Sequence, residues 1–169
     1  VPRSEISRLI VAPIAEAVEG RAMLLGCNYL YDGGNRYVPS VRTGADSFAT
    51  WAGLTHNVVS VAARYWANKR LWINDPDFAL CRGPETSADP ELGHLNASLV
   101  FITAEQSQEQ AAAHLKPRVD LRRKEIEILL SVVLVAGGAV NLSDKLYCLN
   151  AAGLDLARRL VSAEFGEAA

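Results

Sequence analysis

The segment "LWINDPDFALCRG", residues 71–83, begins as an apolar strand and changes within a few residues to Asn-Asp-Pro-Asp. A short apolar run bounded by asparagine, aspartate and proline is typical of a buried strand that ends in a turn. Asp75 and Asp77 therefore lie at the end of a strand, where burial makes a charged carboxylate costly. We expect the charge to be tolerable there because the end of the strand is an open polar pocket rather than part of the core.

Three other segments share this pattern of an apolar run that ends in polar groups. They are "RAMLLGC" (21–27), "YVPSVRTGAD" (37–46) and "AVNLSD" (139–144). Strands that are apolar along their whole length are expected in a parallel sheet with both faces covered. In a (β/α)8 barrel the carboxyl ends of the strands carry the active site. Four such strands correspond to half of a barrel.

Helical patterns alternate with these strands, which predicts an α/β fold with parallel strands. The predicted helices are residues 4–19, 48–70 in one or two pieces, 119–138 and 151–161. We expect Pro13 to kink or break the first helix. Asp120 is the expected N-cap of the third, and Gly137-Gly138 its end. Residues 84–119 are expected to form a long loop insertion in a single segment that spans residues 1–169.

The composition excludes several classes of function. The chain has 169 residues, a net charge of -2 and 50% hydrophobic residues, which suits one domain without a basic surface for nucleic acid. Three widely separated cysteines and three unpaired histidines predict no metal site. No glycine-rich phosphate loop is present, so we expect no cofactor. The sequence has no membrane-spanning run, and a reducing, cytoplasmic location is the expectation.

The motifs, taken in order, resemble those of a known enzyme family. "LLGC", "VRTGADSFATW", "RLWINDPDFALCRG" and "AGGAVNLSDKL" are similar to the retaining α-galactosidases of glycoside hydrolase clan D, most closely family 36. The resemblance extends over roughly residues 21–161. It implies a (β/α)8 TIM barrel, of which this chain would hold strands five to eight. The connection over residues 84–119 is longer than the family's usual one.

The resemblance also implies roles for individual residues. Asp46 would be the catalytic acid/base, and Arg42 a neighbour that contacts substrate or tunes charge. Asp77 would line the sugar pocket, with Cys27 near the sugar. The nucleophile of the family is an aspartate in a Lys-x-Asp motif at the end of the fourth strand, a segment that this sequence does not contain. An α-galactoside or related oligosaccharide is the implied substrate.

Simpler interpretations of the same residues stay open. Arg42 and Asp46 also suit a surface ion pair, and Asn-Asp-Pro-Asp also suits a turn. Asp75 and Asp77 are both candidate substrate-binding residues, and one of them can anchor the loop while the other accepts sugar hydroxyl groups. Trp51 suits either stacking on a sugar or packing in the core. Asp144 is expected to cap the helix that follows it.

Two hypotheses for the whole chain follow. In the first, the chain is the acid/base half of a glycosidase barrel. In the second, it is a non-catalytic truncated or split half-barrel that folds with, or binds, a complementary half. In both, the remaining N-terminal half of the barrel is the expected partner. Unpaired strand edges also favour a homo-oligomer.

Overall fold

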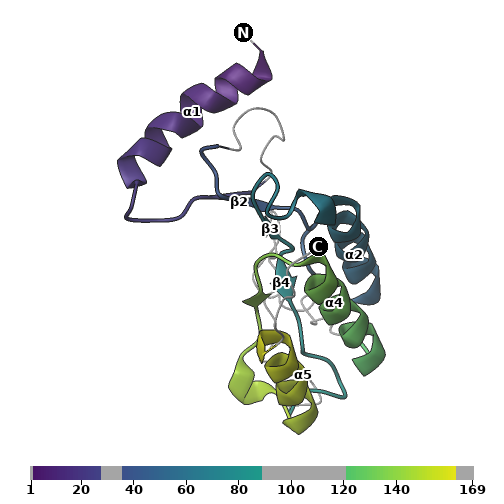
Figure 1. The fold of residues 1–169 in the computed structure, drawn as a ribbon. Coiled ribbons are helices and arrows are strands. Elements are labelled where there is room, and N and C mark those ends of the chain that lie inside the picture. Colours follow the sequence, from purple (N-terminus) through teal and green to yellow (C-terminus); the bar gives the residue numbers. More distant parts are fainter. Residues whose placement is uncertain (1, 28–35, 89–120, 163–169) are drawn as a thin grey trace, which may run out of the picture.

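The computed structural model describes residues 2–27, 36–88 and 121–162. It is a mixed α/β structure of helices and short parallel strands (Figure 1). The elements in chain order are α1 (Arg3–Val18), β1 (Leu25–Gly26), β2 (Ser40–Arg42), α2 (Trp51–Arg64), the 3-10 helix η1 (Tyr65–Ala67), β3 (Ile73–Asp75), β4 (Phe78–Ala79), α4 (Arg123–Ala136), β5 (Asn141–Leu142), the 3-10 helix η3 (Leu146–Cys148) and α5 (Ala151–Ser162).

The strands form two parallel sheets that the chain itself joins. The first has the order β1-β2-β3, and the second pairs β4 with β5. Only Pro76 and Asp77 separate β3 from β4, so the two strands are parts of one bent strand. Arg42 lies opposite Asp75 in the register of β2 and β3. The polar residues that follow successive strands are therefore brought to the same end of the sheets, as the sequence predicts.

Most predicted helices are confirmed, and their ends have local causes. The segment 48–70 folds as two pieces, α2 and η1, and the Thr50 side chain accepts a hydrogen bond from Gly53 N at 3.2 Å at the start of α2.

Helix α4 ends at Gly137, which has a φ of 67° that favours glycine. Its N-cap is Arg122, so the prediction of Asp120 at the cap is wrong. The Arg122 amide donates to Glu125 Oε2 at 2.8 Å, and this contact satisfies the helix start.

The main core lies between α2, α4, α5 and the second sheet. Its members are buried apolar side chains from all four parts, including Leu54, Ala79, Ile126, Leu129 and Leu160. Figure 1 shows α2 and α4 side by side, with α5 beyond them. A second, smaller cluster contains Val38, Val41, Ala67 and Trp72, and Val11 of α1 packs against it.

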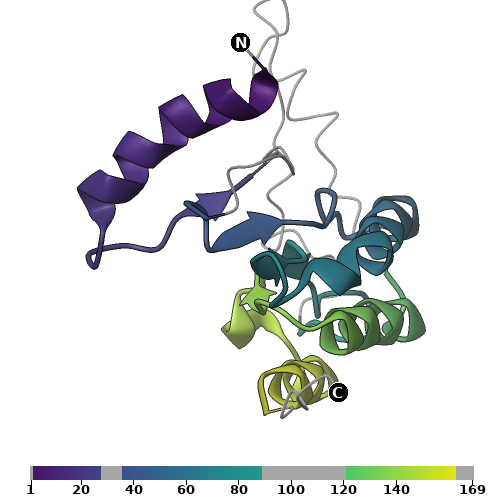
Figure 2. The same ribbon diagram turned by 45° about the horizontal axis from the view of Figure 1, so that its top comes forward.

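Helix α1 and strand β1 depart from the sequence-based expectations. The helix continues through Pro13 instead of ending there. Figures 1 and 2 show it at the opposite end of the molecule from α5. Its apolar residues Ile6, Leu9, Ile10 and Ile14 are exposed. Leu25 of β1, predicted to be buried, is 44% exposed. An apolar run is enough to predict a strand or a helix, but burial of its side chains also requires a neighbouring layer. The side chains of Leu25 and of the apolar residues of α1 face solvent.

The start of the predicted 84–119 insertion is described as far as residue 88. Residues 84–86 form a turn, and Ser87 makes an isolated antiparallel bridge with Leu149. The backbone amide of Ala88 donates to the Cys148 carbonyl at 2.9 Å. These contacts fasten the first residues of the insertion to the segment between β5 and α5. Residues 89–119 lie outside the described residues.

Candidate active site

Arg42 is the centre of a cluster at the strand ends, named here the Arg42 cluster and made of Cys27, Arg42, Asp46 and Asp77. The Nη2 of Arg42 donates to Asp46 Oδ1 at 2.8 Å and forms an ion pair with Asp77 Oδ2 at 2.5 Å. Its Nη1 lies 3.7 Å from Cys27 Sγ. Residues from three separate parts of the sequence therefore meet at one guanidinium, whose planar fork suits several simultaneous partners.

Asp77 is the buried anion of the cluster. Its side chain is 5% exposed, and its backbone has a φ of 73°, in the left-handed region that few residues other than glycine adopt. Besides Arg42, the Ser47 amide donates to Oδ2 at 2.6 Å. Burial raises the pKa of Asp77 above its ordinary value, while the Ser47 amide and the charge of Arg42 act in the opposite direction. Its charge therefore depends on these two partners.

Asp75 anchors the bend between β3 and β4. Its Oδ1 accepts from the Asp77 amide at 3.0 Å and from Asn141 Nδ2 at 2.9 Å, and the residue is 4% exposed. The sequence-based expectation was that an open pocket makes both charges tolerable. That explanation is wrong for the isolated chain, because both carboxylates are buried and held by donors. Asp75 ties the bend to β5 and helps to hold Asp77 in its unusual conformation.

Asp46 and Trp51 form the exposed side of the same region. The Asp46 side chain is 76% exposed, although it contacts the largely buried Arg42. Trp51 is the first residue of α2 and is 43% exposed. A partly exposed tryptophan provides a flat apolar surface, and an exposed carboxylate can donate or accept a proton. The structure thus places Asp46 where a ligand can reach it, whereas Asp77 lies beneath.

Two residues that sequence reasoning missed, Asn57 and Gly44, hold the Asp46 and Asp77 loops together. Asn57, fully buried in the middle of α2, donates from Nδ2 to the carbonyls of Ala45 and Pro76. Gly44 packs so closely on Pro76 that a Cβ there would lie 2.0 Å from the Pro76 oxygen. The available signal was an asparagine on the apolar side of a predicted helix, which indicates a buried side chain with specific partners.

Asp144 does not cap a helix, contrary to expectation. Its Oδ1 accepts from Arg82 Nη1 at 3.0 Å, its Oδ2 accepts from the Cys81 amide at 2.6 Å, and its side chain is fully buried. The cap of α5 is Asn150, whose Oδ1 accepts from the amides of Ala152 and Gly153. The pKa of the Cys81 thiol is raised to about 12 by burial and by the Asp144 charge, so this thiol stays protonated at neutral pH.

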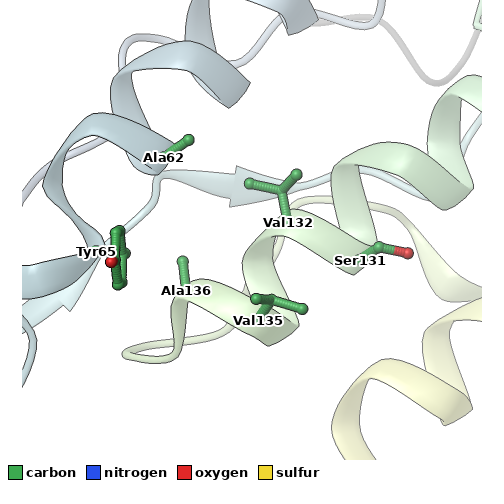
Figure 3. A pocket seen from close by; sticks show the side chains of 6 residues that line it. All are labelled: Ala62, Tyr65, Ser131, Val132, Val135 and Ala136. Atoms are coloured by element: carbon green, nitrogen blue, oxygen red, sulfur yellow. The ribbon is translucent and has the colours of Figure 1, made fainter.

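An apolar groove lies at the other end of the helices. It is lined by Ala62, Tyr65, Ser131, Val132, Val135 and Ala136, which come from the last turns of α2 and α4 and from η1 (Figure 3). By contrast, Cys27, Arg42 and Asp46 of the Arg42 cluster precede the start of α2, and Asp77 accepts a hydrogen bond from Ser47, which also precedes that start. Because the groove offers only two hydroxyl groups and no charge, it has little means of acid/base chemistry.

Two further observations limit the chemistry of the described residues. Residues 2–27, 36–88 and 121–162 contain no group of three or more His, Cys, Asp or Glu side chains placed to bind a metal ion. Within the same ranges, no helix has the length and apolar character needed to cross a bilayer.

Comparisons with known proteins found no matching family model, curated protein or solved structure. Function is therefore inferred from the motifs and from the geometry of the cluster.

Proposed function

We propose that this chain is the acid/base half of a retaining glycoside hydrolase that acts on α-galactosides, corresponding to strands five to eight of a (β/α)8 barrel. The observation that carries the proposal is the Arg42 cluster. Its residues lie at the ends of successive parallel strands, which is where barrel enzymes bind and transform their substrates. Asp46 and Asp77 are also the residues that the family resemblance selects.

The different surroundings of the two carboxylates suit two different roles. Asp46 is exposed and oriented by Arg42, so it can give a proton to the leaving oxygen and later take one from water. Asp77 is buried and fixed by Arg42 and the Ser47 amide. A rigid, buried anion of this kind suits the orientation of Arg42 beneath Asp46, and contact with sugar hydroxyl groups is a role that only the family resemblance implies for Asp77. Cys27 and Trp51 would border the same sugar.

The nucleophile must come from another segment in this proposal. A retaining glycosidase holds its two catalytic carboxyl groups about 5–5.5 Å apart, and one of them forms the covalent glycosyl-enzyme. The complementary N-terminal half of the barrel would supply that aspartate next to β1. Leu25 on β1 and the apolar stripe of α1 are exposed in this chain, which supports a partner at this side.

The test is reconstitution with a complementary half. We expect the purified chain alone to leave aryl α-galactosides intact, because an acid cannot replace the covalent step. Combined with, or fused to, the N-terminal half of a family 36 barrel with its Lys-x-Asp motif, it should release the aryl group. The measurement is absorbance of the released nitrophenol. Turnover by the chain alone that disappears in Asp46→Ala would contradict the proposal.

A second candidate function is a non-catalytic half-barrel module that only binds a complementary half. The exposed apolar residues of α1 and β1 favour it, since they offer a docking surface without requiring chemistry. Reconstitution separates the two candidates. Association without release of the aryl group supports the module, whereas turnover that requires Asp46 supports the enzyme.

We also expect the chain alone to associate with itself. Among the described residues β1 is the edge strand of its sheet, and Ile6, Ile10 and Leu25 are exposed. Both conditions favour association. Light scattering after gel filtration should give a mass above one chain. Ile6→Lys with Ile10→Lys should shift the mass toward the monomer, whereas Val135→Lys on the distant groove should not. A dilute wild-type monomer with a cooperative melt would contradict this expectation.

A further inference from the structure

We propose that Asn57 is a positioning residue that fixes the loop of Asp46 against the loop of Asp77. Its contacts are independent of any assignment of function, but their importance for catalysis rests on the proposed glycosidase activity. Asn57 itself lies within α2, beneath the two loops, and touches neither carboxylate through any contact described here. Its effect would be exerted through the backbone.

The amide group of Asn57 joins the two loops directly. Nδ2 donates to the Ala45 carbonyl at 2.8 Å and to the Pro76 carbonyl at 2.7 Å. Ala45 immediately precedes Asp46, and Pro76 immediately precedes Asp77. One planar NH2 group therefore binds the residue before each carboxylate, and its two hydrogens set the separation of the two carbonyls.

Neighbouring contacts leave the two loops little freedom to move apart or together. The Ala45 amide donates to Ser60 Oγ at 2.7 Å, so α2 holds both polar groups of this residue. Gly44 contacts the Pro76 carbonyl so closely that any side chain there would collide with it. Asn57 thus acts at a site where the backbones already touch, and where a small displacement changes the relative position of Asp46 and Asp77.

The burial of Asn57 indicates that its donor group is the part that matters. The residue is 0% exposed, and within the described ranges its Oδ1 accepts no hydrogen bond. A buried amide with an unpaired oxygen is less favourable than an apolar side chain of the same size unless its NH2 group is needed. Leucine would fill the space but leave both carbonyls unpaired. Aspartate would keep the shape and remove the two-hydrogen donor.

The first arm of the test is amide hydrogen exchange in the full chain. The Ser47 amide reports the loop separation, because its bond to Asp77 Oδ2 crosses between the loops at 2.6 Å. In Asn57→Asp and Asn57→Leu we expect Ser47 to exchange roughly tenfold faster, as when a buried carbonyl loses its donor. Val61→Ala is the matched control, since Val61 is buried one turn further along α2. In Val61→Ala, the Ser47 amide should exchange no faster than the change in global unfolding accounts for.

A wild-type measurement keeps the proposal testable if the variants do not fold. Both Nδ2 hydrogens of Asn57 should exchange slowly in nitrogen-proton spectra, because each is bonded to a carbonyl. Rapid exchange of either hydrogen would overturn the proposal. The proposal would also be overturned if the Ser47 amide of the Asn57 variants exchanged at the rate found in the wild type or in Val61→Ala.

The second arm uses the reconstituted enzyme and separates the two proposals. Asn57→Asp should slow substrates with poor leaving groups more than those with good ones, because misplacement affects the acid, whereas Val61→Ala should slow both equally. An equal effect of Asn57→Asp on both substrates would overturn its catalytic importance. If the wild-type assembly is inactive, the glycosidase proposal fails, and the Ser47 exchange still decides whether Asn57 fixes the loops.

Discussion

Asp46→Ala, in the reconstituted enzyme, is expected to slow substrates with poor leaving groups by roughly 10²–10⁴-fold, the range of general acid–base catalysis. Such substrates need a proton to depart, and Asp46 is the exposed carboxylate that would supply it. Substrates with good leaving groups should still form the glycosyl-enzyme. That intermediate should persist, because no base remains to activate water. Burst kinetics with dinitrophenyl and methyl α-galactosides would measure the difference.

Added azide distinguishes the acid/base from the nucleophile. Azide needs no base, so it should restore turnover of Asp46→Ala and give the galactosyl azide of retained, α configuration. In a variant that lacks the nucleophile, azide would occupy the vacated space and give the β product. Proton NMR of the rescued product decides between them. A β-azide would mean that Asp46 has the other role, and unchanged activity would mean that it is an ordinary loop residue.

Arg42→Met is expected to have the largest effect on stability. Arg42 is the ion-pair partner of Asp77, and the two side chains are 18% and 5% exposed. Removal of one partner of a buried pair leaves an uncompensated charge, which typically costs about 3–5 kcal/mol. We expect a loss of this size in the free energy of unfolding at pH 7. Urea unfolding followed by tryptophan fluorescence, under conditions where the chain does not aggregate, measures it.

The pH dependence of this loss identifies Asp77 as its cause. Because burial raises the folded-state pKa of Asp77, its protonated form is the one that folding favours. Its contribution to stability is therefore complete below the unfolded pKa and is lost as the pH rises through the folded pKa. The defect of Arg42→Met should accordingly be largest at neutral pH and shrink in acid. Without Arg42, the folded pKa of Asp77 should rise further.

A double variant is the control for this interpretation. Asp77→Asn removes the charge but keeps the shape, so adding it to Arg42→Met should recover a large part of the lost stability. Arg42→Met alone also removes the contact with Asp46, but Asp46 is exposed and its pair contributes little. A loss that is independent of pH and unchanged by Asp77→Asn would show that the side-chain volume of Arg42, not its charge, is responsible.

The helices show where local sequence is sufficient. The apolar spacing of residues 151–161 and 119–138 predicted α5 and α4, and Gly137 predicted the end of α4, because these signals act within one or two turns. The prediction of Asp120 as a cap failed by two positions, since side chains near a helix start compete for the same amides. Of the predicted kink or break at Pro13, the break does not occur, because the helix tolerates the one missing hydrogen bond.

By itself, the sequence determined the alternation of strand and helix and the polar ends of the strands, and its resemblance to a known family singled out Arg42, Asp46 and Asp77 as candidate site residues. Periodicity and turn chemistry are local properties, so they can be recognised along the chain. Only the tertiary structure showed that Arg42 binds Asp46 and Asp77 together, that Asp144 pairs with Arg82, and that Asn57 joins two loops. Apart from the Arg42–Asp46 pair, these contacts join residues that are distant in the sequence. Their partners are set by how strands and helices pack, which no local pattern contains.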